Sequence, residues 1–270
     1  MRLGDAVRLA VGTLTTVPVP APRVIDRAVA GAAMVLGPVA AVPLAVVAGL
    51  IVAGGSALGL PALAVAALSL GAVALGSRGL HLDGLADTAD GLGASYDREK
   101  ALDVMRRGDS GPTGVATLVF TLLVQVGALT GAVTAGHGVA AVVIAVLAGR
   151  CTLSMSCARG VPPARPEGLG ATVAGSVPVP AAVATGLLAA ALAGLGLFGL
   201  GWSGVEWSGL GPVAGRLWWR GPVAVAAAYA AAALLLTRCV RRLGGITGDV
   251  LGAGVEVAVA AALLVLAPPM

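Results

Sequence analysis

Three aspartates stand close together at residues 81–91 of the 270-residue chain, in the run HLDGLADTADG. Asp83, Asp87 and Asp90 are spaced i, i+4 and i+7, so on a helix their side chains share one face. Like charges at this spacing repel each other, and Asp is a poor helix former. A divalent cation would offset the repulsion, and Mg²⁺ prefers oxygen ligands. The sequence therefore predicts that these carboxylates bind Mg²⁺; the alternative is a solvated acidic helix face.

A second acidic pair lies near the end of the sequence. Asp249 follows the glycine-rich run 244–248, and Glu256 lies seven residues further on, so the two share a helix face. Glycines before a helix expose amide groups that suit an anion such as phosphate. Glu256 lies inside an apolar stretch, where an ionisable side chain is by default a functional candidate. Both are predicted metal ligands, and a structural pairing of Glu256 with Arg150 is the alternative.

Two further polar side chains are candidates for phosphate binding. His81 either orients or protonates a phosphate, or simply lies at the membrane interface. Arg165 is suited to a bidentate phosphate contact, although an ordinary arginine of a basic loop explains it equally. These residues are of the types that phosphoryl transfer requires, because that chemistry asks the protein mainly for positioning and charge neutralisation.

The composition indicates which elements must position these side chains. Hydrophobic residues make up 58% of the chain and charged residues only 11%, whereas soluble proteins have about 25% charged residues. This deficit excludes a single soluble domain and predicts an all-α, polytopic transmembrane bundle that forms one catalytic unit over residues 1–270. About seven spans are predicted, with six to eight compatible, because each span needs about 20 apolar residues: 29–53, 60–80, 114–135, 138–157, 179–201, 222–237 and 250–268.

Basic residues predict the orientation. Fourteen of the 17 Lys and Arg residues fall on one side of the seven spans, Arg216 and Arg220 fall on the other, and Arg150 falls within a span. Basic loops face the cytoplasm, so the site is expected on the cytoplasmic side of a bacterial inner membrane. Residues 1–28 are expected to include a helix lying in the membrane interface. The cytoplasmic loops are then the acidic segment and two others: 79–113, 158–178 and 238–250.

Other classes of partner are not indicated. The arginines are scattered through loops that flank the spans, so nucleic acid is not an expected partner. Cys151, Cys157 and Cys239 have no spacing typical of a zinc site or a disulfide framework. The lipid bilayer is the expected environment, and homo-oligomerisation is left open.

Four motifs make the chain resemble the cobalamin synthase family, the adenosylcobinamide-GDP ribazoletransferases. Their order and spacing agree with that family over nearly the whole chain. After Met105 the family commonly has a Lys-Asp-Ser-Arg-like run, and here the charges are rearranged although the spacing to Gly114 is kept. The matching motifs are HLDGLADTADG at 81–91, REKAL at 98–102, ARPEGLG at 164–170 and GGITGDVLGA at 244–253.

The resemblance implies a reaction. Adenosylcobinamide-GDP and α-ribazole (or α-ribazole 5′-phosphate) would give adenosylcobalamin (or its 5′-phosphate) and GMP, with Mg²⁺ as cofactor. A ribose hydroxyl would attack the phosphorus attached to cobinamide. Asp83 and Asp87 would be metal ligands, Asp90 a third ligand or the general base, and Asp249 and Glu256 would hold a second metal or orient the nucleophile. The residues expected to contact substrate are His81, Arg106, Arg107, Asp109, Arg165 and Glu167.

Two other functions fit parts of the pattern. A CDP-alcohol phosphotransferase-like enzyme would share the membrane helices, Mg²⁺ and several aspartates. Its usual motif has an Asp three residues before the Asp-Gly pair and an Arg after the following Ala, and this chain has neither around Asp83. A transporter is disfavoured because no internal repeat is evident and the acidic residues gather at one side, away from the middle of the membrane.

Overall fold

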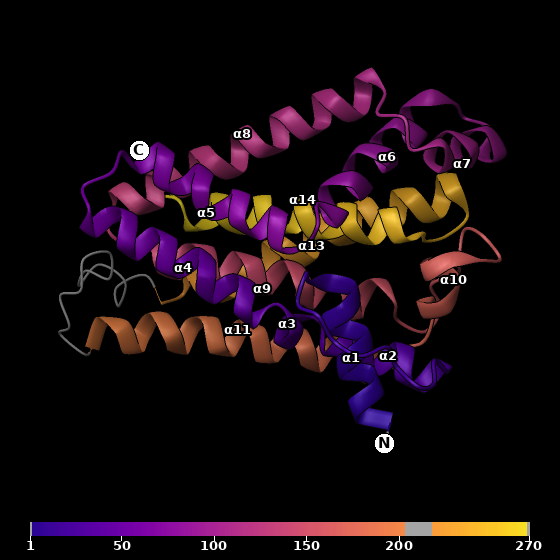
Figure 1. Cartoon of the computed structure of the whole chain (residues 1–270), viewed down its shortest axis with the longest axis horizontal. Coiled ribbons are helices and arrows are strands. Elements are labelled where there is room, and N and C mark those ends of the chain that lie inside the picture. Colours follow the sequence, from indigo (N-terminus) through magenta and orange to yellow (C-terminus); the bar gives the residue numbers. More distant parts are fainter. Residues whose placement is uncertain (1, 203–217, 269–270) are drawn as a thin grey trace.

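The computed structural model describes residues 2–202 and 218–268 (Figure 1). The loop predicted to carry Arg216 therefore lies outside the described residues. Within them the chain is helical, and pairing between extended segments is confined to two isolated β-bridges. The helices are α1 (Arg2–Leu14), α2 (Arg27–Val35), α3 (Gly37–Ala40), α4 (Val42–Ala57), α5 (Ala62–Gly76), α6 (Leu80–Ala94), α7 (Arg98–Arg107), α8 (Pro112–Thr134), α9 (Gly138–Ser156), α10 (Gly168–Val173), α11 (Val179–Trp202), α13 (Arg220–Leu243) and α14 (Gly248–Leu266).

Five of these helices are long and apolar enough to cross a membrane: α8, α9, α11, α13 and α14. They correspond to the last five predicted spans, so the expectation of an all-α, multi-pass membrane bundle is confirmed. A count of seven is wrong, because the structure provides five such helices among the described residues, or six if the bent pair α5–α6 is counted as one span.

The first predicted span, 29–53, is broken into α2, α3 and α4. Pro38 stands in the first turn of α3 and Pro43 in the first turn of α4. Proline has no N–H to donate and its ring clashes with the preceding turn, so each proline starts a new helical segment. The segment that remains, α4, has 16 residues and is short for a span, which needs about 20.

The second predicted span, 60–80, ends early in a sharp bend. Helix α5 stops at Gly76, and α6 leaves it at an angle of 88°. Arg78 and Gly79 make the bend, because both have left-handed backbone conformations, with φ values of 58° and 69°. A left-handed conformation costs a non-glycine residue roughly 1–2 kcal/mol. Arg78 therefore adopts an unfavourable backbone conformation at a position where glycine would have none of this cost. The acidic run therefore lies on a helix of its own, outside the five spans.

Arg78 joins this bend to the N-terminal helix α1. Its Nη2 atom donates to the carbonyls of Gly12 and Thr13 at 2.7 and 3.3 Å, at the C-terminal end of α1. The main chain adds a further bond, from the Thr16 N–H to the Gly76 carbonyl. Helix α1 is thus attached to the start of α6, which carries the aspartates.

Replacing Arg78 by Gly should remove the hydrogen bonds that hold α1 to the bend and also remove the backbone strain at residue 78. Glycine adopts φ near 60° without a steric penalty, so the melting temperature (Tm) of the bundle should change little, whereas trypsin should cleave more rapidly after Arg8 and Arg23. Arg78→Lys is the matched control, because it keeps the positive charge but not the forked donor. Limited proteolysis of the purified protein measures the effect. Unchanged cleavage in Arg78→Gly would show that α1 is held by other contacts.

Helix α14 occupies the centre of the bundle and packs against α6, α8, α9 and α13. Figure 1 shows α8 and α11 on opposite sides of this central layer, with α6, α7 and α10 gathered at one end. Small residues permit the close approach that holds helices together in lipid. A Cβ atom at Gly149 of α9, for example, would lie 2.7 Å from the side chain of Val259. The end that carries α6, α7 and α10 is called the polar end below.

Candidate functional site

The site begins where α6 crosses the start of α14. A Cβ atom at Gly84 would lie 2.6 Å from the carbonyl oxygen of Asp249 and 2.9 Å from its Cα atom. One turn further along α14, a Cβ atom at Gly252 would lie 3.0 Å from the Cα atom of His81. The two backbones therefore touch through glycines. This contact brings the aspartates of residues 81–91 beside Asp249, although about 160 residues separate them.

Asp83, Asp87 and Asp249 form an acidic cluster at this crossing. Asp87 is buried, and the pKa of its carboxyl is raised from 3.8 to about 6, mainly by burial. The charges of Asp83, Asp249 and Asp90 contribute to this rise, and the charge of Arg165 opposes it. Three carboxylates thus converge closely enough to repel one another. A bound cation would relieve that repulsion.

Two loops from the second half of the chain complete the cluster. Pro163 and Ile246 form a parallel β-bridge, in which the Ala164 N–H donates to Ile246 O and the Ile246 N–H donates to Pro162 O, both at 2.9 Å. This pairing places Arg165 next to the turn that leads into Asp249. Thr247 caps α14 by accepting from the Val250 N–H.

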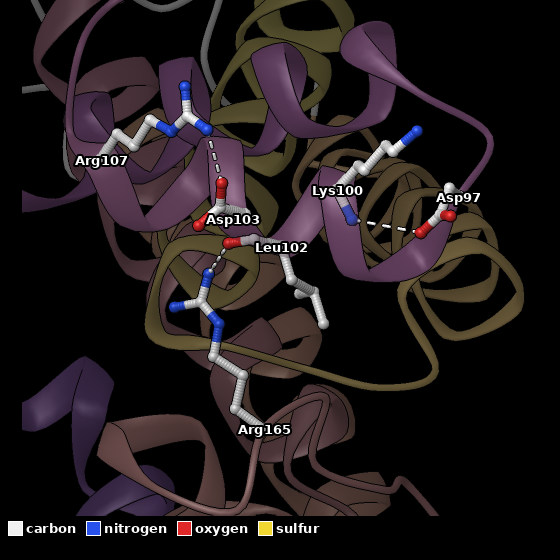
Figure 2. Close-up of polar contacts among 6 residues, drawn as sticks. All are labelled: Asp97, Lys100, Leu102, Asp103, Arg107 and Arg165. Atoms are coloured by element: carbon white, nitrogen blue, oxygen red, sulfur yellow. Dashed lines mark hydrogen bonds and ion pairs between the residues drawn. The ribbon is translucent and has the colours of Figure 1, made fainter.

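Arg165 reaches from this loop towards α7. Figure 2 shows its guanidinium below α7, where Nη2 donates to the carbonyl of Leu102 at 2.6 Å. The same side chain interacts electrostatically with Asp87 and Asp249. It is half-buried, so the guanidinium is fixed beside the acidic cluster. An anion that approaches the cluster would meet this positive charge.

Asp90 has a different setting from the other two aspartates of its run. Its Oδ2 accepts from the Gly111 N–H at 2.7 Å and its Oδ1 accepts from the Gly114 N–H at 2.8 Å. These amides belong to the residue before α8 and to its first turn, so Asp90 caps α8 from a neighbouring helix. Both carboxylate oxygens are engaged, and Asp90 joins α6 to α8.

Glu256 and His81 also lie apart from the acidic cluster. Glu256 Oε2 accepts from Gln125 Nε2 at 2.9 Å, in the buried part of the bundle. His81 is buried, and its Nδ1 lies 3.2 Å from Nη2 of Arg150. Burial and then the charge of Arg150 lower the pKa of His81 well below its usual value, which favours the neutral imidazole. Neither side chain faces the open end of the site.

The remaining predicted contacts lie on the exposed surface of the polar end. Arg107 forms an ion pair with Asp103 at 2.6 Å within α7 (Figure 2). Arg106 and Asp109 are exposed nearby, and Glu167 is exposed at the start of α10. None of these residues is brought into the acidic cluster by the structure, so their roles stay predictions.

Arg78, which was not among the site residues predicted from the sequence, lines a cavity together with Asp83. An open cavity of about 540 Å³ is lined by Arg78, Asp83 and Ser110 together with apolar residues of α6 and α8. Arg78 faces this cavity from the bend between α5 and α6. The only signal in the sequence was an arginine before a glycine at the end of an apolar stretch, which is also typical of an ordinary loop.

The donor set determines which metal would fit. Among the described residues, no group of three or more His, Cys, Asp or Glu side chains is arranged to hold a metal ion by itself. Mg²⁺ is usually bound by one or two carboxylates and completes its shell with water and substrate phosphates. The cluster of Asp83, Asp87 and Asp249 beside Arg165 fits this mode of binding, in which metal and phosphate are held together.

These features define a multi-pass membrane protein with an acidic, phosphate-compatible site at one end of its helices. The family model described as cobalamin-5-phosphate synthase matches residues 6–267, and the chain belongs to that family. It is therefore a transferase of cobalamin biosynthesis, and the resemblance found in the motifs is confirmed. No solved structure matches the chain.

Curated relatives carry a consistent name, adenosylcobinamide-GDP ribazoletransferase. The protein of Nocardioides sp. is 44% identical over 260 residues, covering 96% of this chain and 97% of that protein. The protein of Frankia casuarinae is 39% identical over 192 residues, with 70% and 66% covered. The protein of Ectopseudomonas mendocina is 37% identical over 193 residues, with 70% and 69% covered.

Proposed function

We propose that this chain transfers the adenosylcobinamide-phosphate group from adenosylcobinamide-GDP to α-ribazole or α-ribazole 5′-phosphate, with release of GMP. The observation that carries this proposal is the convergence of Asp83, Asp87 and Asp249 beside Arg165. A pyrophosphate is the substrate group that such a combination of acidic oxygens, cation and guanidinium would recognise. The names of the relatives support the identity of the two substrates.

In the proposed reaction a ribose hydroxyl attacks the phosphorus bonded to cobinamide. The new P–O bond forms as the bond to the leaving GMP breaks. Mg²⁺ would be held by Asp83 and Asp87 and would neutralise charge on the phosphates. Arg165, beside the cluster, would bind the pyrophosphate. Asp249 orients the ribose hydroxyl and accepts its proton, while Thr247 donates a 3.1 Å hydrogen bond to its Oδ2.

Asp90 and Glu256 are not assigned to the metal or to the substrate in this proposal. The two amide donors on Asp90 make it the link between α6 and α8, so we do not include it as a ligand or base. Glu256 is likewise left out, because its carboxylate accepts a hydrogen bond from Gln125.

We place the site on the cytoplasmic side of the inner membrane, because the polar end carries the basic segments and basic segments face the cytoplasm.

The direct test is GMP release by the purified protein in detergent. Adenosylcobinamide-GDP is supplied with α-ribazole or with α-ribazole 5′-phosphate, each with Mg²⁺ and with a chelator. Release that needs both substrates and Mg²⁺ is expected. Transfer from CDP-activated alcohols, without any from adenosylcobinamide-GDP, would favour the CDP-alcohol phosphotransferase alternative.

Ionisation of Asp87 should make the stability of the folded protein depend on pH when a chelator has removed divalent cations. The folded state holds the Asp87 proton up to about pH 6, whereas the unfolded chain releases it near 3.8. More protons are then bound in the folded state between these values, so stability is lost as pH rises from about 4 to about 6. Asp87→Asn should therefore have a higher Tm than wild type at about pH 7, and an equal Tm below about pH 4.

Thermal unfolding at both pH values measures this difference. Adding Mg²⁺ at about pH 7 should raise the Tm of the wild type and leave that of Asp87→Asn nearly unchanged, because a ligand stabilises only the state that binds it. Equal melting temperatures at about pH 7 in chelator would show that the Asp87 carboxylate is not destabilised by its surroundings.

A further inference from the structure

Arg150 is a charged side chain enclosed in the interior of the bundle. It belongs to the span α9 and is 1% exposed. Its Nη2 atom lies 3.2 Å from Nδ1 of His81, its Nη1 atom has a 3.5 Å contact with the Val146 carbonyl, and its Nε atom has no hydrogen-bond partner among the described residues. An arginine within the membrane is costly unless an opposite charge or polar groups accompany it.

The opposite charge comes from Glu256 on α14. Glu256 is the carboxylate whose charge acts on Arg150. It is itself 8% exposed and is held by Gln125 of α8, whose Nε2 atom donates to both Oε2 and the main-chain carbonyl of Glu256. No direct ion pair within 4 Å joins Arg150 to Glu256 in the described part of the chain. The two charges face each other across a gap.

A small cavity lies between the two charged side chains. Arg150, Gln125 and Glu256 are its polar lining, and the other walls are apolar residues such as Leu70, Val146 and Val259. Its volume is about 20 Å³, and a cavity above about 10–15 Å³ with two to four polar partners holds one water molecule. A guanidinium donor, an amide and a carboxylate acceptor supply those partners.

We propose that Arg150 is a positioning residue, which pairs with Glu256 through one internal water molecule and donates to His81 to fix α6 against α9 and α14. Arginine can only donate, so Nδ1 of His81 is the acceptor and its proton is on Nε2. One polar residue from each of α6, α8, α9 and α14 meets at this point. The network lies beneath the acidic cluster and sets the position of the helix that carries it.

The effect on activity follows from the position of His81. It lies two residues before Asp83 on the same helix, so a shift or rotation of α6 at His81 also moves the Asp83 and Asp87 carboxylates. A displacement of about 1 Å in a positioned reactant can reduce a rate roughly 100-fold. This catalytic part of the inference rests on the proposed function of Asp83 and Asp87, whereas the pairing of Arg150 with Glu256 does not.

A double-mutant cycle tests the pairing. Arg150→Met and Glu256→Gln each leave one uncompensated charge inside the protein, so each should lower the Tm strongly. The double variant removes both charges and should recover about half or more of the summed loss. Arg159→Met is the matched control, because it removes an exposed arginine next to α9 and should leave the Tm unchanged. Losses of Tm that simply add would overturn the pairing.

Kinetics test the positioning. In the double variant much of the Tm is recovered but His81 has lost its donor, so kcat for GMP release should stay at least about 10-fold below wild type, with KM for adenosylcobinamide-GDP within about twofold. Arg150→Lys keeps the positive charge and an ammonium group that can donate to His81, and should retain more of kcat than the double variant. A double variant with wild-type kcat would overturn the positioning role. Wild-type protein without GMP release would refute the proposed function and leave the Tm cycle intact.

Discussion

Replacing Asp87 or Asp83 by Asn is expected to reduce GMP release by about 10²–10³-fold or more, a loss typical of removing one preorganised electrostatic group from an active site. Both substitutions keep the size of the side chain and remove a negative charge from the acidic cluster. The folded protein should therefore be at least as stable as wild type, since the repulsion among Asp83, Asp87 and Asp249 is reduced. The lost activity would then reflect lost cation and phosphate binding alone.

The measurement is initial-rate GMP release at saturating Mg²⁺, with the amount of folded protein checked by size-exclusion chromatography. Asp103→Asn is the matched control. Asp103 lies at the same polar end and is exposed in an ion pair with Arg107, and such a surface pair contributes about 0–1 kcal/mol. Its activity should stay near that of wild type. Normal kcat in Asp83→Asn or Asp87→Asn would refute the assigned ligand role of that residue.

The second large effect is expected at the helix crossing. In Gly84→Ala the new methyl group would lie 2.6 Å from a main-chain oxygen of Asp249, and the main chain of α14 cannot give way as a flexible side chain can. Helices α6 and α14 must separate, which should lower the Tm by several degrees and reduce GMP release by about 10²-fold, because the acidic cluster is pulled apart.

Gly71→Ala is the matched control for that substitution. Gly71 lies inside helix α5, and a Cβ atom there has no neighbour within 4 Å. Alanine is preferred over glycine in a helix by about 1 kcal/mol, so Gly71→Ala should leave activity unchanged and raise the Tm slightly. The same change from glycine to alanine is thus predicted to lower the Tm at position 84 and to raise it at position 71. Equal Tm in Gly84→Ala and Gly71→Ala would contradict the close contact of α6 with α14.

The sequence predicted the long spans well because mean hydropathy over about 20 residues is a local property. Residues 29–53 were predicted as one span that Pro38 and Pro43 could kink, since proline is often tolerated within membrane helices when neighbouring groups satisfy the backbone, whereas the structure has three separate helices there. The bend at Arg78 was also missed, because its left-handed conformation leaves no pattern of residue types. Both errors lie in the first third of the chain, where apolar runs are long enough to pass for single spans.

The candidate site was predicted in part for a similar reason. The spacing of Asp83 and Asp87 indicated a shared face, but Asp90 at the third position finds its partners, Gly111 and Gly114, more than 20 residues away. Likewise, the meeting of Arg165 with Asp249 depends on a β-bridge between two loops of irregular structure. Such pairings are set by the tertiary fold, and helical periodicity carries no information about them.

Helix α14 follows all the other described helices in the chain and lies at the centre of the bundle. Until it has left the ribosome, the glycine face of α6 has no helix to meet and the carboxylate of Asp249 is absent. A chain truncated before α14 is therefore expected to be catalytically silent. The acidic cluster can therefore assemble only once α14 has joined the other helices.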